Sequence, residues 1–398
     1  MALRPIRVLG IMTGTSCDAL DGICSEFQND QLPKTIWRGS TPFPAALRKR
    51  VLAAQKPGFR LTLSDYLLLE RDLGRWFASA IERLLRKHDA LEERVDLIAN
   101  HGQTIAHHPE LSTTLQAGDP AIIANQTGLT VVSHFRQGDL AAGGQGAPLV
   151  PLYHRLILEQ LSQRRGGMAI HNLGGASNLT YLGPDMTLLA FDTGPANYWI
   201  DDATLLHTAN RSHFDREGQL ARQGTADEAA VRRLLCLPYF AKKPPKSTGR
   251  DDFPFSLLRK TTRAHGPDLI ATATEVTARS IAAAYQRFIQ NRGLPIDVIY
   301  FSGGGSKNLF LLERIAALLP DIRVEVFERS DFDPQYIEAQ AFGYFGWLTL
   351  SGKSLSGAWT GARPGAPPGQ ITPGRNWLSL LELLAKNGIR SETNSWSD

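Results

Sequence analysis

The chain lacks the marks of several protein classes. Its 398 residues hold three cysteines (Cys17, Cys24 and Cys236), none in a Cys-x-x-Cys pair, which fits a reduced compartment and gives no disulfide framework. A formal net charge of +4, with no run of lysine or arginine, gives nucleic-acid or membrane-surface binding no electrostatic support. No apolar stretch has the length of a signal-peptide core or a membrane span, so we expect a cytoplasmic protein.

The first glycine turn lacks three well-known active-site signatures. This turn, at 14–21, has neither the Gly-Lys-Ser/Thr of a Walker A loop nor the Gly-x-Gly-x-x-Gly dinucleotide fingerprint. A serine hydrolase elbow is disfavoured because Cys17 and Asp18 follow Ser16, where Gly-x-Ser-x-Gly would need glycine. What is present is an ordinary soluble composition, 42% hydrophobic and 21% charged, in a chain too long for a single core.

Short apolar runs alternate with helical patterns along the chain, which predicts an α/β fold with mixed sheets. The strand-like runs are 7–12, 22–27, 95–100, 130–135, 168–173, 179–182, 188–192, 298–302 and 324–328. The helical patterns cover 63–87, 148–160, 269–290, 308–319 and 337–350.

One motif occurs twice: a short strand, a turn of Gly, Ser, Thr, Asn or Asp, and a second strand. Its copies lie at 7–23 and 168–181. Glycines let the backbone approach a ligand, and turn N–H groups with hydroxyls form a concavity that suits phosphate oxygens. Two such hairpins, one opening each half, predict two related lobes that hold a polyphosphate between them.

The second copy also sets the predicted domain boundary, near residue 165. We expect an N-terminal lobe at 1–165 and a C-terminal lobe at 166–385. The Pro- and Gly-rich stretch 362–374 is typical of a surface loop, and the end of the chain, 386–398, of a disordered tail.

The two hairpin turns supply the first ATP-binding candidates. These are Gly14, Thr15, Ser16, Cys17, Asp18, Ala19, Leu20 and Asp21 in the first copy and Gly174, Gly175 and Asn178 in the second. Hydroxyls of Thr15 and Ser16 can meet terminal phosphates, and the carboxylates of Asp18 and Asp21 can organise Mg²⁺. Taken alone, the first segment also fits an ordinary hairpin turn.

A third group of ATP-binding candidates follows the strand at 188–192. Asp192, Gly194 and Asn197 lie at a strand end, where the active-site carboxylates of α/β proteins commonly gather. An Asp–Gly turn that caps the next helix explains these residues equally well.

Three consecutive glycines, Gly303, Gly304 and Gly305, join an apolar strand to a helix that begins near Asn308. Such a turn lets the backbone pack against a flat base or ribose, and a helix N-terminus favours phosphate. A plain strand–helix junction rarely needs three glycines, so we predict a nucleotide contact here.

The glycine-rich segment 133–148 supplies the acid–base candidates. We expect a strand to deliver Arg136 and Asp139 into a loop. Asp139 would act as a general base near the acceptor, and Arg136 would bind an anionic group of the substrate. The alternative is an exposed Arg–Asp pair on a flexible loop.

A histidine-rich segment follows the strand at 95–100. His101, His107 and His108 match no familiar zinc spacing and have no cysteine nearby, so no metal ligands are predicted. We interpret them as polar loop residues, with His101 or Gln103 in contact with a sugar.

Together the motifs resemble the anhydro-N-acetylmuramic acid kinases. In chain order they are Gly-x-Met-x-Gly-Thr-Ser-x-Asp, His-Gly-Gln-Thr, Asp-x-Ala-x-Gly-Gly-Gln-Gly-Ala-Pro-Leu, Asn-x-Gly-Gly, Asp-Thr-Gly-Pro, Lys-Ser-Thr-Gly-Arg and Ser-Gly-Gly-Gly-x-x-Asn. The resemblance covers residues 8 to 348. Departures are small: Ala196 stands where the family usually has Gly, and Cys17 where Leu is common.

The resemblance implies a two-lobed actin/hexokinase/Hsp70-like fold with an interlobe nucleotide cleft. It implies ATP- and Mg²⁺-dependent phosphorylation of 1,6-anhydro-N-acetylmuramic acid with hydrolytic ring opening, giving N-acetylmuramic acid 6-phosphate in murein recycling. Asp139 matches the family's catalytic Asp, and Glu338 matches a Glu expected to contact the sugar. The turn at 14–21 matches its first phosphate loop and 303–308 its adenosine motif.

Three alternatives remain open from the sequence. One is a nucleotide-switched binding protein of the same fold, actin- or chaperone-like, and another is a different sugar kinase. A third is a metal-dependent hydrolase that uses His101, His107 and His108. The expected partner is a small sugar, and a homodimer is left open as an assembly.

Overall fold

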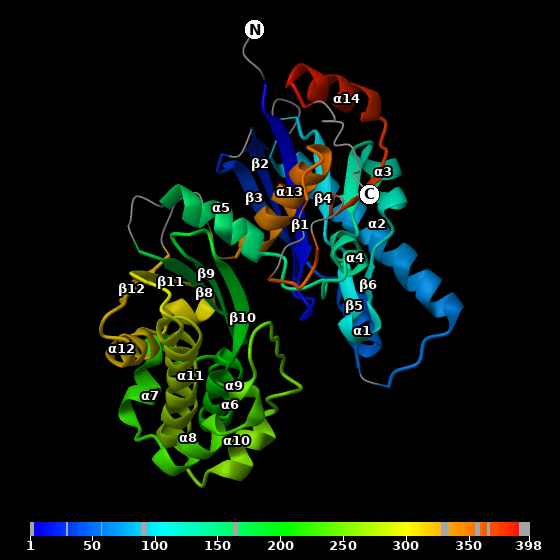
Figure 1. Cartoon of the computed structure of the whole chain (residues 1–398). Coiled ribbons are helices and arrows are strands. Elements are labelled where there is room, and N and C mark those ends of the chain that lie inside the picture. The colour runs from blue at the N-terminus through cyan, green and yellow to red at the C-terminus, as the bar shows by residue number, and fades with distance from the viewer. Residues whose placement is uncertain are drawn as a thin grey trace. The chain divides into compact units, whose positions relative to one another are not determined.

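The computed structural model describes residues 4–28, 31–56, 58–88, 94–161, 166–327, 333, 335–354, 359–363 and 367–389 (Figure 1). The chain divides into two compact units. Unit 1 joins Met1–Leu156 to Ser330–Asp398, and unit 2 is Ile157–Arg329. Most of the predicted disordered tail, 390–398, lies outside the described residues. Among the described residues, no helix combines the length and apolar composition needed to cross a membrane.

Unit 1 contains a mixed six-stranded sheet, a small two-stranded sheet and most of the helices that flank them. Its strands are β1 (Ile6–Thr13), β2 (Ala19–Phe27), β3 (Lys34–Pro42), β4 (Leu97–Asn100), β5 (Gln103–His108), β6 (Thr113–Ala117), β7 (Thr130–Ser133) and β13 (Gln370–Thr372). Its helices are α1 (Ala45–Ala54), α2 (Leu63–Lys87), α3 (Pro120–Thr127), α4 (Phe135–Ala141), α13 (Ile337–Leu350) and α14 (Trp377–Lys386), with a 3₁₀ turn at Pro109–Leu111; α5 (Pro151–Leu161) contains the boundary.

Unit 2 contains a five-stranded sheet and the remaining helices. Its strands are β8 (Met168–Leu173), β9 (Ala176–Leu182), β10 (Leu188–Pro195), β11 (Val298–Ser302) and β12 (Arg323–Val326). Its helices are α6 (Asn197–His207), α7 (Gln219–Gln223), α8 (Glu228–Leu235), α9 (Pro238–Ala241), α10 (Phe255–Thr261), α11 (Gly266–Phe288) and α12 (Leu309–Leu318), with 3₁₀ turns at Arg216–Gly218, Gln290–Arg292 and Gly304–Lys307.

The two main sheets share one strand order. In unit 1 the order β3-β2-β1-β4-β7 has antiparallel pairing from β3 to β1 and parallel pairing from β1 to β7, with β13 added at the edge. In unit 2 the order β10-β9-β8-β11-β12 repeats this pattern. The hairpins β1–β2 and β8–β9 therefore occupy equivalent positions, as the repeated motif predicts, and the expected two-unit α/β architecture is confirmed.

Helix α13 packs against the sheet of unit 1, along β1, β2 and β4 (orange in Figure 1). Gly10 of β1 permits this contact, since a Cβ there would lie 2.7 Å from the backbone N of Gly343 and closer still to the carbonyl O of Ala339. On the same helix Gly346 faces the Cβ of Ala99 in β4. Glycine on both elements lets a helix backbone approach a strand backbone.

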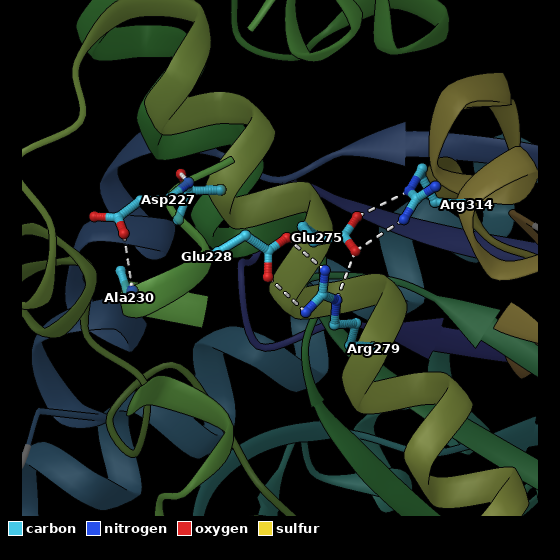
Figure 2. A network of polar contacts seen from close by, with 7 residues as sticks. Asp227, Glu228, Ala230, Glu275, Arg279 and Arg314 are labelled. Carbon is cyan, nitrogen blue, oxygen red and sulfur yellow. Dashed lines mark hydrogen bonds and ion pairs between the residues drawn. The ribbon is translucent and has the colours of Figure 1, made fainter. Parts of the chain in front are cut away.

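Helix α11 is the central helix of unit 2 and is buried along most of its length. At its exposed side a network of ion pairs links three helices (Figure 2). Glu275 of α11 accepts hydrogen bonds from Arg314 of α12 and from Arg279, which also pairs with Glu228 of α8. These contacts tie α8 and α12 to the central helix.

Three regional expectations differ from the structure. The sequence predicts residues 330–385 in the second lobe, but they belong to unit 1, where α13 covers the sheet. The stretch 362–374 contains β13, which pairs with β7 and is therefore not loop throughout. Strand β7 ends at Ser133, and the residues that follow His134 form helix α4 instead of a loop.

Candidate active site

The turn between β1 and β2 is held by its own backbone and by an arginine. The amide N of Cys17 donates to the carbonyl O of Gly14 at 3.1 Å. Arg48 donates to the carbonyl oxygens of Ser16 and Cys17 and pairs with the Asp18 carboxylate at 3.0 Å. Asp18 is thus already engaged by a cation, while the hydroxyl-bearing side chain of Ser16 is exposed.

Two of the predicted phosphate-loop side chains lie in the core. Cys17 and Leu20 both belong to the apolar cluster of unit 1. Burial raises the pKa of the Cys17 thiol to about 11, with Arg48 opposing the rise, so this cysteine is an inert thiol at neutral pH. Any contact that these two residues make with a phosphate would come from their backbone N–H groups.

Gln103 contacts the backbone of the turn between β1 and β2. Its side chain is fully buried, and Nε2 donates to the carbonyl O of Gly14 at 3.3 Å. Its Oε1 atom is buried and has no hydrogen-bond partner among the described residues. The side chain predicted to contact the sugar therefore faces the turn backbone in this structure.

Asp139 is the most completely buried carboxylate of the predicted site, with no exposed surface. The backbone N of Gly146 donates to its Oδ2 at 2.7 Å, and the hydroxyl of Thr360 donates to its Oδ1 at 2.7 Å. Gly144 lies so close that an added Cβ would clash with the carboxylate. Asp139 is accordingly fixed by helix α4, the glycine-rich loop that follows it, and a segment near the C-terminus.

Arg136, one turn earlier on α4, is fixed by a histidine. Its Nε–H donates to Nε2 of His101 at 3.0 Å, and Nη1 donates to the carbonyl O of Gly146 at 2.8 Å. An arginine can only donate, so His101 carries its proton on Nδ1, which lies 2.8 Å from the carbonyl O of Gly102. Burial, and then the Arg136 charge, hold the pKa of His101 well below its ordinary value, so the ring is neutral.

Glu338 and Asp21 complete the charged set in unit 1. Glu338, the second residue of helix α13, keeps exposed surface, but desolvation by the surrounding chain raises the pKa of its carboxyl; the Arg136 charge opposes the rise, and the Asp21 charge adds to it. Burial lowers the pKa of Arg136. The negative charges of Glu338 and Asp139 oppose this fall. The Arg136 guanidinium is therefore flanked by carboxylates from α4 and α13, and Asp21 of β2 acts on Glu338. Outside this set, Gln335 donates to Asp21 at 3.1 Å.

The other two histidines do not join His101. His107 Nδ1 contacts the hydroxyl of Thr114, and His108 Nδ1 contacts Glu110. Within the described part of the chain, no group of three or more His, Cys, Asp or Glu side chains is arranged to hold a metal ion. The three-histidine arrangement that a metal-dependent hydrolase would need is not formed.

In unit 2 the turn between β8 and β9 is joined to the start of α6. The carbonyl oxygens of Gly174 and Gly175 accept the backbone N–H groups of Ala196, Asn197 and Tyr198 at 2.9 to 3.1 Å. The backbone amides at the N-terminus of α6 are therefore already hydrogen-bonded within the protein.

A row of polar side chains crosses the sheet beside this turn. Asn178 of β9 is paired in register with Asn172 of β8 and with Asp192 of β10. Asp192 Oδ2 accepts the backbone N–H of Thr248 at 2.8 Å. Burial raises the pKa of Asp192 to about 6, while Thr248 and Lys246 oppose the rise, so at neutral pH the carboxylate is mostly ionised.

The Gly303–Gly305 turn lies against Asn197. Gly303 has φ +81°, and a Cβ there would clash with Asn172, while a Cβ on Gly305 would lie 2.7 Å from Oδ1 of Asn197. Gly304 instead faces open space, with the nearest atom 4.0 Å away. Asn308 caps helix α12 by accepting the N–H of Leu311.

These residues open onto a pocket of about 670 Å³ that lies within unit 2. The pocket is lined by the predicted Asn197, Gly304, Gly305 and Asn308 and by Ile200, Asp201, Phe214, Asp215, Arg216, Glu217, Lys307 and Leu309. Phe214 and Leu309 are 55% and 49% exposed, which gives the pocket apolar walls of the kind that a nucleobase packs against.

Sequence reasoning missed Asp201, Phe214 and Glu217 because no glycine turn or strand end marks their segments. Asp201 lies on α6, four residues after Asn197, so the helical repeat places both on one face. Burial, together with Asp202, raises the pKa of Asp201 to about 7 against the opposing charge of Arg250. The four-residue spacing from Asn197 along a helix could have identified Asp201 from the sequence.

Comparisons with known proteins agree along nearly the whole chain. Residues 6–374 match the family model described as anhydro-N-acetylmuramic acid kinase. A protein of that name from Gloeobacter violaceus is 39% identical over 389 residues, which cover 93% of this chain and 100% of the relative. A second, from Idiomarina loihiensis, is 38% identical and covers 86% and 91%.

Solved structures resemble the chain more distantly. Component A of (R)-2-hydroxyglutaryl-CoA dehydratase from Acidaminococcus fermentans is 12% identical with a TM-score of 0.41, covering 86% of this chain and 98% of that one. A ROK family glucokinase from Streptomyces griseus, in complex with glucose and AMPPNP, is 13% identical with a TM-score of 0.34, covering 85% and 98%.

Proposed function

The chain belongs to the anhydro-N-acetylmuramic acid kinase family, and from that premise we propose which of its residues carry each part of the reaction. The enzyme uses ATP, opens the 1,6-anhydro ring of anhydro-N-acetylmuramic acid with water, and phosphorylates O6. The products are N-acetylmuramic acid 6-phosphate and ADP, which makes this a step of murein recycling.

Asp139 is the general base. One observation carries this assignment: a carboxylate without exposed surface is held through both oxygens by Gly146 and Thr360, beside the charged group of Arg136. A base held in one orientation by packing and hydrogen bonds needs little reorganisation to take a proton. Each carboxylate oxygen can accept a further hydrogen bond, so the contacts with Gly146 and Thr360 leave it able to bind water.

The chemistry balances with one base. Asp139 takes a proton from water as the water oxygen bonds to the anomeric carbon of the sugar. The bond from that carbon to O6 breaks, and O6 takes the electron pair and attacks the γ-phosphorus of ATP. ADP leaves, and the proton on Asp139 is released to solvent.

Arg136 and Glu338 position the sugar. The neutral His101 ring fixes the Arg136 side chain, so the guanidinium keeps its remaining N–H groups for an anionic group such as the lactyl carboxylate of the substrate. Glu338, at the start of α13, is exposed and can accept hydrogen bonds from sugar hydroxyls. Gln103 acts indirectly, through the Gly14 carbonyl that it supports.

The nucleotide contacts come from three turns. The pocket of unit 2 takes the adenosine, with Gly304 facing the open side and Phe214 and Leu309 as apolar walls. Backbone N–H groups of the two equivalent hairpin turns, with the Ser16 hydroxyl, take the phosphate oxygens.

Mg²⁺ accompanies ATP in this proposal. Asp18 is paired with Arg48, whereas among the described residues Asp21 makes a single hydrogen bond, with Gln335, so Asp21 is the carboxylate that would hold the ion, directly or through water. When bound, the ion neutralises charge on the phosphate oxygens. A cytoplasmic location and a homodimer belong to the same proposal, and light scattering would test the assembly.

The test is an Asp139→Asn variant in a coupled assay of ADP release, with and without the anhydro sugar. Asn keeps the shape, and its amide can accept the Gly146 N–H and donate to the Thr360 hydroxyl, but it takes no proton at neutral pH, so kcat should fall by roughly 10²–10⁴-fold while ADP still binds in calorimetry. Asp321→Asn, at an exposed turn of unit 2, is the matched control and should keep wild-type kcat. Near-normal turnover by Asp139→Asn would move the base to another residue.

A further inference from the structure

Unit 2 contains a second pocket whose central feature is a buried lysine. Lys246 is only 5% exposed, and its ammonium lies against the rings of Phe191, Tyr239 and Phe288 at 5.8, 4.6 and 5.2 Å from their centroids. Its one hydrogen bond runs from Nζ to the carbonyl O of Tyr239, at 3.3 Å. Two of the three N–H donors thus have no protein acceptor in the part of the chain that the structure describes.

No carboxylate of the described residues forms an ion pair with the Lys246 ammonium. Among the described residues, no carboxylate lies within 4 Å of the Lys246 Nζ atom. Asp192 acts on it only from a longer distance, and the carboxylate of Asp192 is already bonded to the backbone of Thr248. Arg287 and Lys242 add positive charge on the same side. A buried ammonium without a counter-ion is costly, so the arrangement is incomplete as the chain alone forms it.

The open space beside the ammonium has a volume of about 530 Å³. Thr193, Ser280 and Arg287 contribute polar groups to its wall, and Leu237 and Phe240 contribute apolar ones. It shares no lining residue with the 670 Å³ pocket assigned to adenosine. The hydroxyls of Thr193 and Ser280 are already hydrogen-bonded within the chain, so the two cations and the apolar wall are what fit a small organic molecule with one anionic end.

We propose that this pocket is a binding site for a small organic anion, with a carboxylate or phosphate group on Lys246 and Arg287 and an apolar body against Leu237 and Phe240. The group would satisfy the two unused donors of Lys246 and supply its missing counter-charge. The chemistry of recognition is the same for a carboxylate and a phosphate monoester, so the experiment separates them.

A chain of buried hydrogen bonds leads from this pocket to the β8–β9 turn. Thr193 Oγ1 lies 2.5 Å from Ser177 Oγ, which lies 2.6 Å from His171 Nε2, and all three side chains are buried. Ser177 follows the Gly174–Gly175 turn by two residues. Occupancy of the pocket therefore acts on residues beside the proposed phosphate turn, and we expect the anion to change ADP affinity.

The pH dependence follows from the groups around Lys246. Burial lowers the pKa of Lys246 to about 8, Arg287 and Lys242 lower it further, and Asp192 opposes them. An anion binds the charged form and so raises this pKa. Affinity should be highest below pH 8 and fall as the pH rises through 8 and above.

The experiment follows the Cε–Hε NMR signal of Lys246 in protein labelled with ¹³C-lysine, assigned by its loss in Lys246→Met. Saturating ADP keeps the probes out of the nucleotide site, and the probes are inorganic phosphate and butyrate. In the wild type the titration midpoint of Lys246 should lie near 8 and move up with either probe. A shift with one probe alone identifies that anion class.

Thermal shift measures the same binding independently. The rise in Tm caused by the better probe should require about tenfold more anion, or disappear, in Lys246→Met, because a charge-assisted hydrogen bond is lost. Lys260→Met, an exposed lysine of α10, should behave as wild type. Lys246→Met should fold, since it removes an unpaired buried charge. An unmoved Lys246 signal at 50 mM of either probe, or unchanged anion binding by Lys246→Met, would overturn the proposal.

Discussion

The hydroxyl of Thr360 donates a 2.7 Å hydrogen bond to Oδ1 of Asp139, across 221 residues of sequence. The same short segment makes two further contacts with the glycine-rich loop: the carbonyl O of Thr360 accepts the N–H of Gln145, and Trp359 Nε1 donates to Pro148. A segment near the C-terminus therefore fixes the orientation of the proposed base.

Replacement of Thr360 by Val should lower kcat about tenfold or more, because a hydrogen bond to a charged group contributes roughly 1.5–3 kcal/mol. The KM for ATP should stay near its wild-type value, since the nucleotide turns are not touched. Thr360→Ser keeps the hydroxyl and should restore most of the rate. A Ser variant as slow as the Val variant would show that the hydroxyl contact is not what matters.

Two neighbouring glycines should respond differently to substitution. Gly304→Val directs its side chain into open space, so the protein should keep its Tm while ADP affinity in calorimetry falls at least about tenfold. Gly305→Ala places a Cβ 2.7 Å from Asn197 and Leu173 and should lower Tm itself. Normal ADP binding by Gly304→Val would remove this turn from the nucleotide site.

The buried carboxyl of Asp201 should make stability depend on pH. Its pKa of about 7 in the folded state lies above the ordinary value of 3.8. Between these two pH values the folded state keeps a proton on this carboxyl, whereas the unfolded state has lost it. Stability should therefore fall as the pH rises from about 4 to 7. Asp201→Asn should have a higher Tm than wild type at pH 8 and an equal one at pH 4, whereas Asp321→Asn should match wild type at both. Equal Tm values for Asp201→Asn at both pH values would contradict the shift.

The close packing of Gly10 against α13 should make that position intolerant of a side chain. Gly10→Ala would force the helix away from β1, and the free energy of unfolding should drop by the upper end of about 1–3 kcal/mol, or more. In Gly249→Ala the new Cβ has no atom within 4 Å, so denaturant unfolding of this control should differ little from wild type. A Gly10→Ala protein as stable as the control would contradict the packing described.

Sequence reasoning was most accurate for long helices. Helix α2 has the bounds that its pattern predicts, and the structure shows what marks its ends: Thr62 caps the first turn, and Arg86 and Lys87 lie in the last. Helix α13 was also predicted with its observed bounds, although it is buried on nearly every side. Strand β3 was not expected, yet its buried positions alternate over several residues, which is a signal that the sequence carries.

The candidate site was predictable only in part. Motifs identified Arg136 and Asp139, but their many glycine neighbours suggested a loop, whereas His134 adopts a left-handed conformation that turns the chain into helix α4. Thr360 carries no motif, and its role depends on a contact between distant segments. A local sequence pattern identifies residues that are close together in the sequence. It does not identify residues that come into contact only when distant segments fold against each other.

The division of unit 1 into two stretches of chain has a consequence for biosynthesis. Unit 2 is continuous, so all its strands and helices are synthesised before α13. Unit 1 cannot cover the Gly10 face of its sheet, add β13 to β7, or bring Thr360 to Asp139 until the last part of the chain emerges. Unit 2 can therefore be completed before unit 1, although the first residues of unit 1 are made earlier, and a chain interrupted before residue 330 has no assembled base.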